Sequence, residues 1–264
     1  MKRYRRLIKR LIILLVFVAI FKYGFSNVRN VNNPNDIMVL VNYKNQISKD
    51  YVPNDLVVPN IEFTFKEDNP KKQMRKPAAL AIEKMFDEAK NQGINLYGVS
   101  GYRSADRQKQ IFDNRVQAEG EVSAREYVAL PGESEHQTGL AMDVGRLEGN
   151  FGQSKEGKWL RDNAHNFGFI LRYPEGKEHI TKINYEPWHF RYVGINPAKE
   201  IYESGLTLEE YIEDIPVYKE KLSLILYIPS KLVANISKIL NKVKSTGILS
   251  VYNEYFIERS WYYV

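Results

Sequence analysis

The feature that most constrains this chain is the placement of two histidines and one aspartate. His136 and Asp143 stand seven residues apart in SEHQTGLAMD (residues 134–143), and His189 ends EPWH (residues 186–189), about 45 residues further on. Two imidazoles and one carboxylate form a ligand set that suits zinc, and three protein ligands leave the fourth tetrahedral position open, as in catalytic sites. The sequence therefore predicts that one zinc ion is held by His136, Asp143 and His189.

Both motifs show the alternation of a β-strand, with the predicted ligands on the polar side. In residues 140–144 the large apolar side chains point to one face and Asp143 to the other, because successive side chains of a strand alternate. In residues 188–192 the aromatic side chains share one face and His189 lies opposite. Two strands can thus offer ligands to one cleft. The alternative is that the histidines are ordinary core residues with satisfied hydrogen bonds.

Helical patterns surround these strands. The clearest helix is residues 77–92, with proline in its first turn, apolar residues at helical spacing and Gly93 as a stop signal. A second helix follows Ser104, which suits an N-cap, and runs to about residue 118. Other expected elements are strands at 38–42, 96–100 and 169–173, a short helix opened by a capping box at Ser123, and a helix at 159–167. Helices beside short antiparallel strands indicate an α+β fold in which a small antiparallel sheet carries the zinc site.

A candidate anion site lies beside the second of these helices. Arg103 ends the preceding strand and Gln108 lies in the first turn of the helix, so a guanidinium, an amide and the positive helix terminus come together. This combination suits a carboxylate such as the end of a peptide. The alternative for Arg103 is a structural ion pair.

Three ordered motifs resemble the VanY-type D-alanyl-D-alanine carboxypeptidases, which belong to a wider group of zinc peptidases with lysostaphin and the hedgehog signalling domain. The motifs are SGYRS (residues 100–104), SEHQTGLAMD (134–143) and EPWHFRY (186–192). The resemblance spans residues 36–214. The chain departs from the family pattern at Lys182, where related sequences usually have glycine, in a loop expected beside the substrate.

The resemblance also implies roles for residues around the ligands. Glu186 matches the carboxylate that takes the proton of the attacking water and passes it to the leaving amine, which is typically worth about 10²–10⁴ in rate. Arg103, Gln108 and Ser134 match positions that bind the terminal residue of the substrate or the oxyanion. The alternatives are a surface carboxylate that caps a turn for Glu186, and a turn cap for Ser134.

The function implied is a zinc carboxypeptidase that removes the C-terminal D-alanine from peptidoglycan stem peptides, in wall remodelling or glycopeptide resistance. Ligand spacing does not distinguish cleavage of a pentapeptide between two D-alanines (DD specificity) from cleavage of a tetrapeptide after the diamino acid (LD specificity). Two other hypotheses stay open: a non-catalytic wall-binding module with structural zinc, and a wall endopeptidase. Glu186 argues against the first, and the carboxylate clamp at Arg103 argues against the second.

The N-terminus predicts a membrane segment. Six of the first ten residues are basic and none is acidic, and the remaining 32 Lys and Arg equal the 32 Asp and Glu, so the net charge of +6 does not indicate a nucleic-acid partner. The apolar run 11–21 matches a signal-peptide core, whereas 7–25 is long enough to span a bilayer. We favour an uncleaved anchor over a cleaved signal. In both cases the basic start places the remainder outside the membrane.

The expected domains are a basic stretch with anchor or signal (1–26), an Asn-rich linker (27–36), the catalytic domain (37–214) and a C-terminal extension (215–264). The extension contains a basic amphipathic pattern at 231–244, which either lies on an anionic membrane or packs on the catalytic domain. We expect a monomer on the outer side of a bacterial cell membrane, single-pass or secreted after signal cleavage.

Overall fold

The computed structural model describes residues 29–214. The predicted membrane segment and the amphipathic pattern of 231–244 lie outside these residues. Among the described helices, none combines the length and the apolar character needed to cross a bilayer. The chain divides into two compact units, Met1–Tyr211 and Ile212–Val264, and all of the predicted site residues belong to the first.

A four-stranded antiparallel sheet lies at the centre of the first unit. Its strands are β5 (Gly98–Ser100), β6 (Ala141–Val144), β8 (His189–Tyr192) and β7 (Phe169–Leu171), in that spatial order. Two small sheets pair β1 (Arg29–Asn30) with β2 (Asn45–Gln46) in parallel and β3 (Leu56–Val57) with β4 (Met74–Arg75) in antiparallel fashion. The mixed fold with a small antiparallel sheet, predicted from the sequence, is thus confirmed.

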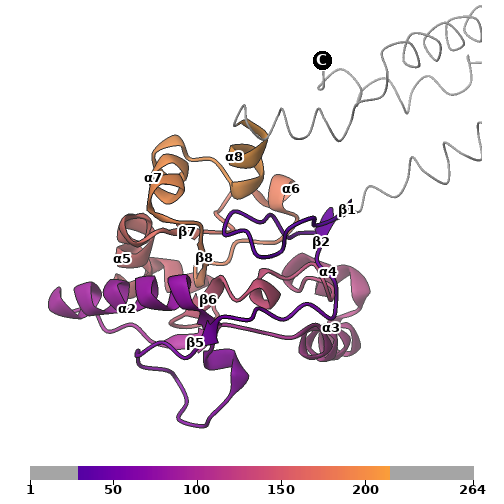
Figure 1. Ribbon diagram of the computed structural model, residues 1–264, viewed down its shortest axis with the longest axis horizontal. Coiled ribbons are helices and arrows are strands. Elements are labelled where there is room, and N and C mark those ends of the chain that lie inside the picture. The colour runs from indigo at the N-terminus through magenta and orange to yellow at the C-terminus, as the bar shows by residue number, and fades with distance from the viewer. Residues whose placement is uncertain (1–28, 215–264) are drawn as a thin grey trace, which may run out of the picture. The chain divides into compact units, whose positions relative to one another are not determined.

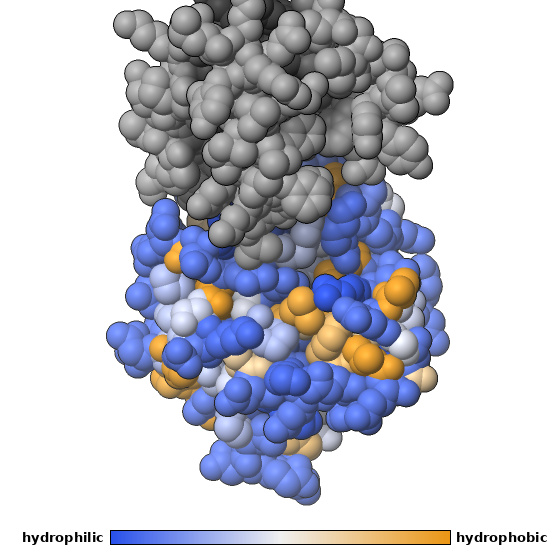
Figure 2. Space-filling view, turned by 90° about the vertical axis from the view of Figure 1, so that its right-hand side faces the viewer, coloured by the Kyte–Doolittle hydropathy of each residue, from blue (hydrophilic) through white to orange (hydrophobic). Residues whose placement is uncertain are grey.

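Helices cover this sheet, with α2 (Lys76–Asn91) and α5 (Lys155–Asn163) on one side of it and α3 (Ala105–Glu119) with α4 (Glu121–Tyr127) on the other in Figure 1. The apolar stripe of α2 belongs to the same buried cluster as Met142 and Phe190 of the sheet. The remaining elements are η1 (Pro70–Lys72), η2 (Glu135–Thr138), η3 (Gly149–Gln153), η4 (Ala164–Phe167), α6 (Glu178–Thr181), α7 (Ile195–Ser204) and α8 (Leu208–Asp214). The face drawn in Figure 2 is mostly hydrophilic, with apolar patches between hydrophilic residues.

Two sequence predictions of secondary structure are wrong. Residues 38–42 form no strand, although Val39 and Val41 are buried, and the backbone at this point is contacted by the side chain of Arg191. Its Nη2 donates to the carbonyls of Ile37 (2.8 Å) and Val39 (2.7 Å). The capping box at Ser123 does not open a helix either: α4 begins two residues earlier, after Gly120, and the Ser123 hydroxyl donates to Glu119 Oε2 (3.0 Å).

Lys182 is the one non-glycine residue with positive φ among those described, at +61°. It follows the last turn of α6, and its backbone N–H donates to the carbonyl of Glu178 (2.9 Å), as a residue that ends a helix in the left-handed region does. For a residue with a Cβ this conformation costs on the order of 1 kcal/mol, whereas glycine adopts it freely.

Candidate metal centre

Strand pairing brings two of the predicted ligands face to face. In the antiparallel pair of β6 and β8, Asp143 stands opposite His189 and Met142 opposite Phe190. Because side chains alternate along both strands, the second pair enters the apolar core while the first points to the other face. The alternation seen in the sequence therefore predicted correctly that both strands present a polar side chain to one side of the sheet.

The third predicted ligand, His136, lies in η2 just before β6. This short helix ends at Gly139, whose φ is +67°, and the chain then turns directly into the strand. A Cβ at Gly139 would lie 2.8 Å from Leu56 Cδ2 and 3.2 Å from the backbone nitrogen of Arg75, so the backbone conformation favours glycine and the space around it is tight. That turn returns His136 toward Asp143.

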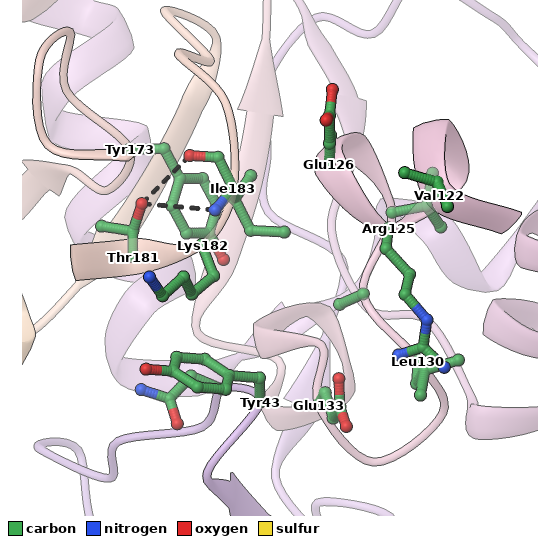
Figure 3. Close-up of a pocket in the computed structure, with 13 residues that line it drawn as sticks. Tyr43, Val122, Arg125, Glu126, Leu130, Glu133, Tyr173, Thr181, Lys182 and Ile183 are labelled. Carbon is green, nitrogen blue, oxygen red and sulfur yellow. Dashed lines mark hydrogen bonds between the residues drawn. The ribbon is translucent and has the colours of Figure 1, made fainter. Parts of the chain in front are cut away.

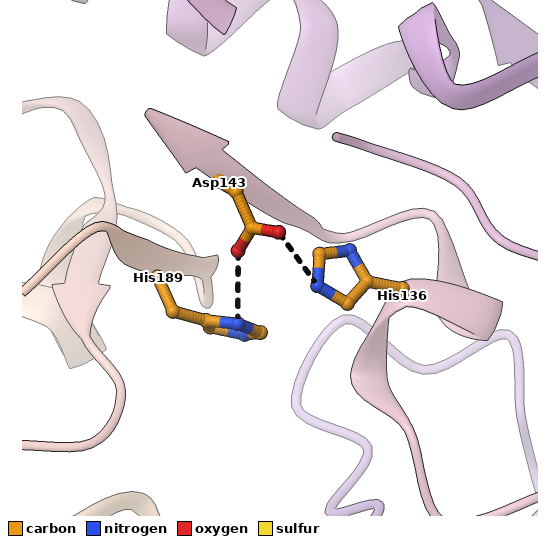
Figure 4. A group of neighbouring side chains, drawn as sticks. All are labelled: His136, Asp143 and His189. Atoms are coloured by element: carbon orange, nitrogen blue, oxygen red, sulfur yellow. Dashed lines mark ion pairs between the residues drawn. The ribbon is translucent and has the colours of Figure 1, made fainter. Parts of the chain in front are cut away.

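The three side chains converge in a buried cluster (Figure 4). Asp143 Oδ2 is 3.4 Å from His136 Nε2 and Asp143 Oδ1 is 3.3 Å from His189 Nδ1. One potential ligand atom from each residue lies within 4.8 Å of the other two. All three residues are at most 4% exposed. These atoms are close enough to share one small cation.

The protonation states that the surroundings impose on His136 and Asp143 also fit zinc. His136 Nδ1 lies 2.7 Å from the carbonyl of Gly101, which can only accept, so Nδ1 carries the proton and Nε2 keeps its lone pair toward Asp143. Burial alone would raise the pKa of Asp143, but the two histidines outweigh it and hold the pKa well below its usual range. Asp143 Oδ1 accepts no hydrogen bond from residues 29–214. An ionised, buried carboxylate beside two imidazoles is a donor set for a divalent cation.

Glu135 is a functional candidate that the sequence reasoning missed. Its Oε2 lies 3.6 Å from His189 Nε2, on the side of the imidazole ring away from Asp143, and neither of these two atoms has a hydrogen bond within the described residues. A carboxylate behind a metal-binding histidine fixes the orientation of the ring and raises its basicity. Burial would lower the pKa of His189, but the carboxylates of Asp143 and Glu135 outweigh it and raise the pKa to about 9.

Two buried arginines hold Glu135 in place. Arg172 Nε donates to Glu135 Oε1 (2.7 Å), and Arg191 Nη1 donates to the same oxygen (2.8 Å). Arg172 also forms two bonds to Glu209 of α8, at 2.8 and 2.6 Å. Burial alone would raise the pKa of Glu135, but the two guanidinium groups keep it well below its usual range. We call these four residues the Glu135 network; it connects the metal centre to β8, to α8 and to the residue that follows β7.

Glu186 lies beside the cluster, as the motif predicts. Its Oε2 is 3.5 Å from His189 Nδ1, and only 8% of the residue is exposed, so it is not a surface carboxylate. Burial raises the pKa of Glu186 to about 8; the attraction of His189 and Arg103 opposes the rise and the charge of Asp143 adds to it. A carboxylate with a pKa near neutral is suited to take and return a proton.

The predicted anion clamp is assembled as well. Arg103 Nη1 donates to Gln108 Oε1 (3.0 Å) and Nη2 donates to Ser100 Oγ (3.0 Å), while Asp143 Oδ2 is 3.7 Å from Nη2. Burial lowers the pKa of Arg103, against the attraction of Asp143 and Glu186. The Ser134 hydroxyl makes no capping bond to η2, which argues against the turn-cap alternative.

One cavity of about 430 Å³ is lined by all seven predicted site residues. They are Arg103, Gln108, Ser134, His136, Asp143, Glu186 and His189. Trp188 also lines it, whereas Tyr102 is buried and does not. The cavity thus brings together a potential metal site, a carboxylate with raised pKa and a cationic clamp. These groups are suited to hydrolysis at the free end of a peptide.

The chain is similar to several known proteins. A family model described as VanY, D-alanyl-D-alanine carboxypeptidase, matches residues 71–195. The putative carboxypeptidase YodJ of Bacillus subtilis (strain 168) is 53% identical over 196 residues, which cover 72% of each chain. The solved LdcB LD-carboxypeptidase is 52% identical, with a TM-score of 0.69 over 71% of this chain and 91% of that one. A mutant of the vancomycin-resistance D,D-pentapeptidase VanY, in complex with Zn(II), is 35% identical, with a TM-score of 0.55 over 66% of this chain and 98% of that one.

Proposed function

Because the chain belongs to the VanY family of D-alanyl-D-alanine carboxypeptidases, we propose that it is a zinc carboxypeptidase that removes the C-terminal D-alanine from peptidoglycan stem peptides. One observation carries the proposal: the buried ligand cluster, Glu186 and the Arg103–Gln108 pair all face the same cavity. A module that only binds the wall would not need a buried carboxylate with a pKa of about 8 beside the ligands.

His136, Asp143 and His189 would hold one zinc ion, which when bound lowers the pKa of water and polarises a carbonyl group. The chain's own residues supply the rest. Arg103 and Gln108 bind the free carboxylate of the substrate and so place the last peptide bond next to Glu186. Ser134, whose hydroxyl forms no capping bond, is available to contact the terminal residue or the oxyanion.

Glu186 moves the proton. It takes a proton from the attacking water while the water oxygen bonds to the carbonyl carbon, and it delivers that proton to the amide nitrogen as the carbon–nitrogen bond breaks. The products are a shortened peptide and free D-alanine. Arg103 lies close enough to the ligand cluster, 3.7 Å from Asp143, to help stabilise the negative charge that develops on the carbonyl oxygen.

The comparisons favour the LD form of the reaction. The identity to the LD-carboxypeptidase LdcB is 52%, against 35% to the D,D-pentapeptidase VanY. We therefore propose that the tetrapeptide, cut after the diamino acid, is the preferred substrate over the pentapeptide.

Release of D-alanine from matched peptides tests both proposals. The full chain with zinc is incubated with tetrapeptide, pentapeptide and a tetrapeptide whose C-terminal carboxylate is amidated. We expect the highest kcat/KM on the free tetrapeptide and little cleavage of the amide, because Arg103 no longer has a carboxylate to bind. Equal cleavage of free and amidated peptides would indicate an endopeptidase. Zinc binding without cleavage of any of them would indicate a binding module.

We also propose that the chain is held at the outer side of a bacterial membrane by residues 7–25. The support is the basic start and the apolar run of the sequence. Protease treatment of intact cells tests this: an anchored external domain is degraded in intact cells and stays with the membrane fraction when cells are broken. A protected chain would refute the external location.

A further inference from the structure

A segment near the start of the domain lies against the loop that carries His136. We call residues 42–51 the strap and residues 132–139 the metal loop. The backbone N–H of Ile47 donates to the carbonyl of Gly132 (2.9 Å). A Cβ at Gly132 would lie 2.9 Å from the carbonyl oxygen of Ile47, so the strap packs directly on the backbone of the metal loop.

Side chains add further contacts between the strap and the metal loop. Gln46 Nε2 donates to Glu133 Oε1 (2.7 Å), a bond between residues 87 positions apart. Tyr43 and Glu133 line one cavity, to which α4 also contributes side chains (Figure 3). Ile47 is 3% exposed and belongs to the buried apolar core. The strap is therefore fixed to the core, and it can hold the metal loop in turn.

Gln137 adds three hydrogen bonds to the strap. Its side chain is buried, and its Nε2 donates to the carbonyls of Ser48 (2.9 Å), Tyr51 (3.1 Å) and Lys49 (3.3 Å). The Tyr51 N–H donates to the Ser48 carbonyl (3.0 Å), so the three acceptors belong to one turn of the chain. A side-chain amide has two N–H hydrogens, which Gln137 shares among these three carbonyls.

The metal loop depends on such contacts because its helix is short. η2 has four residues, and two of its backbone bonds, from Gln137 N–H to the Ser134 carbonyl and from Gly139 N–H to the His136 carbonyl, are both 3.2 Å long. With three residues per turn of a 3₁₀-helix, neighbouring side chains point about 120° apart. His136 therefore faces the metal centre while Gln137 faces the strap, and a rotation of η2 about its axis would move both.

We propose that Gln137 is a positioning residue of the metal centre: by fixing η2 to the strap, it holds His136 where it can share one zinc ion with Asp143 and His189. The inference rests on the proposed function, which takes zinc as the ion at this site. Gln137 lines neither the catalytic cavity nor the cavity of Figure 3, so it acts through His136 and not on the substrate. The strap, which precedes the residues 71–195 that match the family model, becomes a functional part of the centre.

Zinc affinity tests the inference without requiring catalysis. Gln137→Met keeps the length of the side chain but removes the donor, and its zinc affinity is compared with that of the wild type by chelator competition, at a temperature at which all variants are folded. We expect about tenfold weaker binding of zinc, the lower end of the range for residues that orient a metal ligand.

Gln92→Met is the matched control. It makes the same chemical change and removes the acceptor of a bond from Trp159 Nε1 (2.8 Å), which joins α5 to the end of α2, 67 positions away. Neither residue belongs to the strap or to the metal loop. We expect Gln92→Met to lower Tm but to leave zinc affinity unchanged.

A second pair of variants acts through the backbone. Gly132→Ala would place a Cβ against the strap, whereas a Cβ at Gly176 meets nothing within 4 Å, although φ is positive at both positions (+90° and +81°). We expect Gly132→Ala to weaken zinc binding and Gly176→Ala to leave it unchanged. Wild-type zinc affinity in both Gln137→Met and Gly132→Ala would overturn the inference even if both variants lower Tm, because the contacts would then serve only the stability of the fold.

Peptide cleavage separates this inference from the proposed function. If the wild type binds zinc but releases D-alanine from no stem peptide, the proposed function fails, and the inference is decided by the zinc affinities alone. If the wild type cleaves the tetrapeptide while Gln137→Met and Gly132→Ala both bind zinc as the wild type does, only the inference fails.

Discussion

Replacing Glu135 by glutamine tests whether the Glu135 network orients His189 for its metal. Glutamine has the same shape, but it removes the charge that faces Arg172 and Arg191, both fully buried. It also removes the carboxylate whose Oε2 lies 3.6 Å from His189 Nε2. The substitution therefore acts on two quantities, the stability of the fold and the affinity for zinc.

The contacts give the expected size of each effect. Breaking a buried ion pair by removing one partner costs about 3–5 kcal/mol, because the other charge stays buried without compensation. In a domain of this size that corresponds to a fall in Tm of roughly 10 °C. Loss of the carboxylate behind a metal-binding histidine typically lowers metal affinity by about 10–100-fold. We expect Glu135→Gln to show both.

Glu209→Gln is the matched control. Glu209 binds Arg172 through two bonds and is also buried, but His189 is not among its partners. We expect it to lower Tm while zinc affinity, measured by competition with a chromophoric chelator, changes little. Glu135→Gln with the zinc affinity of the wild type would refute the reasoning, as would an equal loss of affinity in Glu209→Gln.

Three further predictions concern the base, the ligands and the turn before β6. Glu186→Gln should keep the affinity for zinc but lower kcat by at least about 10²-fold, measured by D-alanine release. A wild-type kcat in Glu186→Gln would exclude Glu186 as the base. Zinc affinity should rise about tenfold per pH unit as pH approaches 9 and then level off. The reason is that the pKa of His189 is about 9 in the metal-free protein and its proton must leave before the metal binds. A flat pH profile of zinc affinity in calorimetry would contradict this. Gly139→Ala should lower the free energy of unfolding, measured by urea titration, by more than about 1 kcal/mol and by more than Gly176→Ala does. Both positions have positive φ, but of the two only Gly139 is crowded. Equal losses in the two variants would show that crowding by Leu56 is unimportant.

The sequence predicted the site well where the information is local. Asp143 and His189 lie on strands whose alternation fixes the face of each side chain, and the clamp joins Arg103 to Gln108, only five residues later. The N-cap at Ser104 was also predicted, and its hydroxyl accepts from the N–H of Arg107 (3.2 Å). Each of these inferences needs only the geometry of one strand, one helix or one pair of neighbouring segments.

The missed features depend on contacts between distant parts of the chain. Glu135 precedes a ligand in the motif, but its partners Arg172 and Arg191 are 37 and 56 residues away, and no spacing pattern signals that a charged residue is buried with them. The same Arg191 contacts the stretch wrongly predicted as a strand at 38–42, where its Nη2 donates to the carbonyl of Val39 and to that of Ile37 just before it. The one available signal for Glu135 was its position, as a charged residue directly before a predicted ligand.

Mass spectrometry of the full chain and its substrates in one sample tests the central claim most directly. Native spectra report the number of zinc ions per chain, and peptide spectra report what is lost from the tetrapeptide and pentapeptide, with Glu186→Ala and a chelator as controls. We predict one zinc ion per chain and loss of a single alanine from the peptide end, abolished by both controls. Zinc bound with both peptides intact, or alanine loss that persists in Glu186→Ala, would contradict the account.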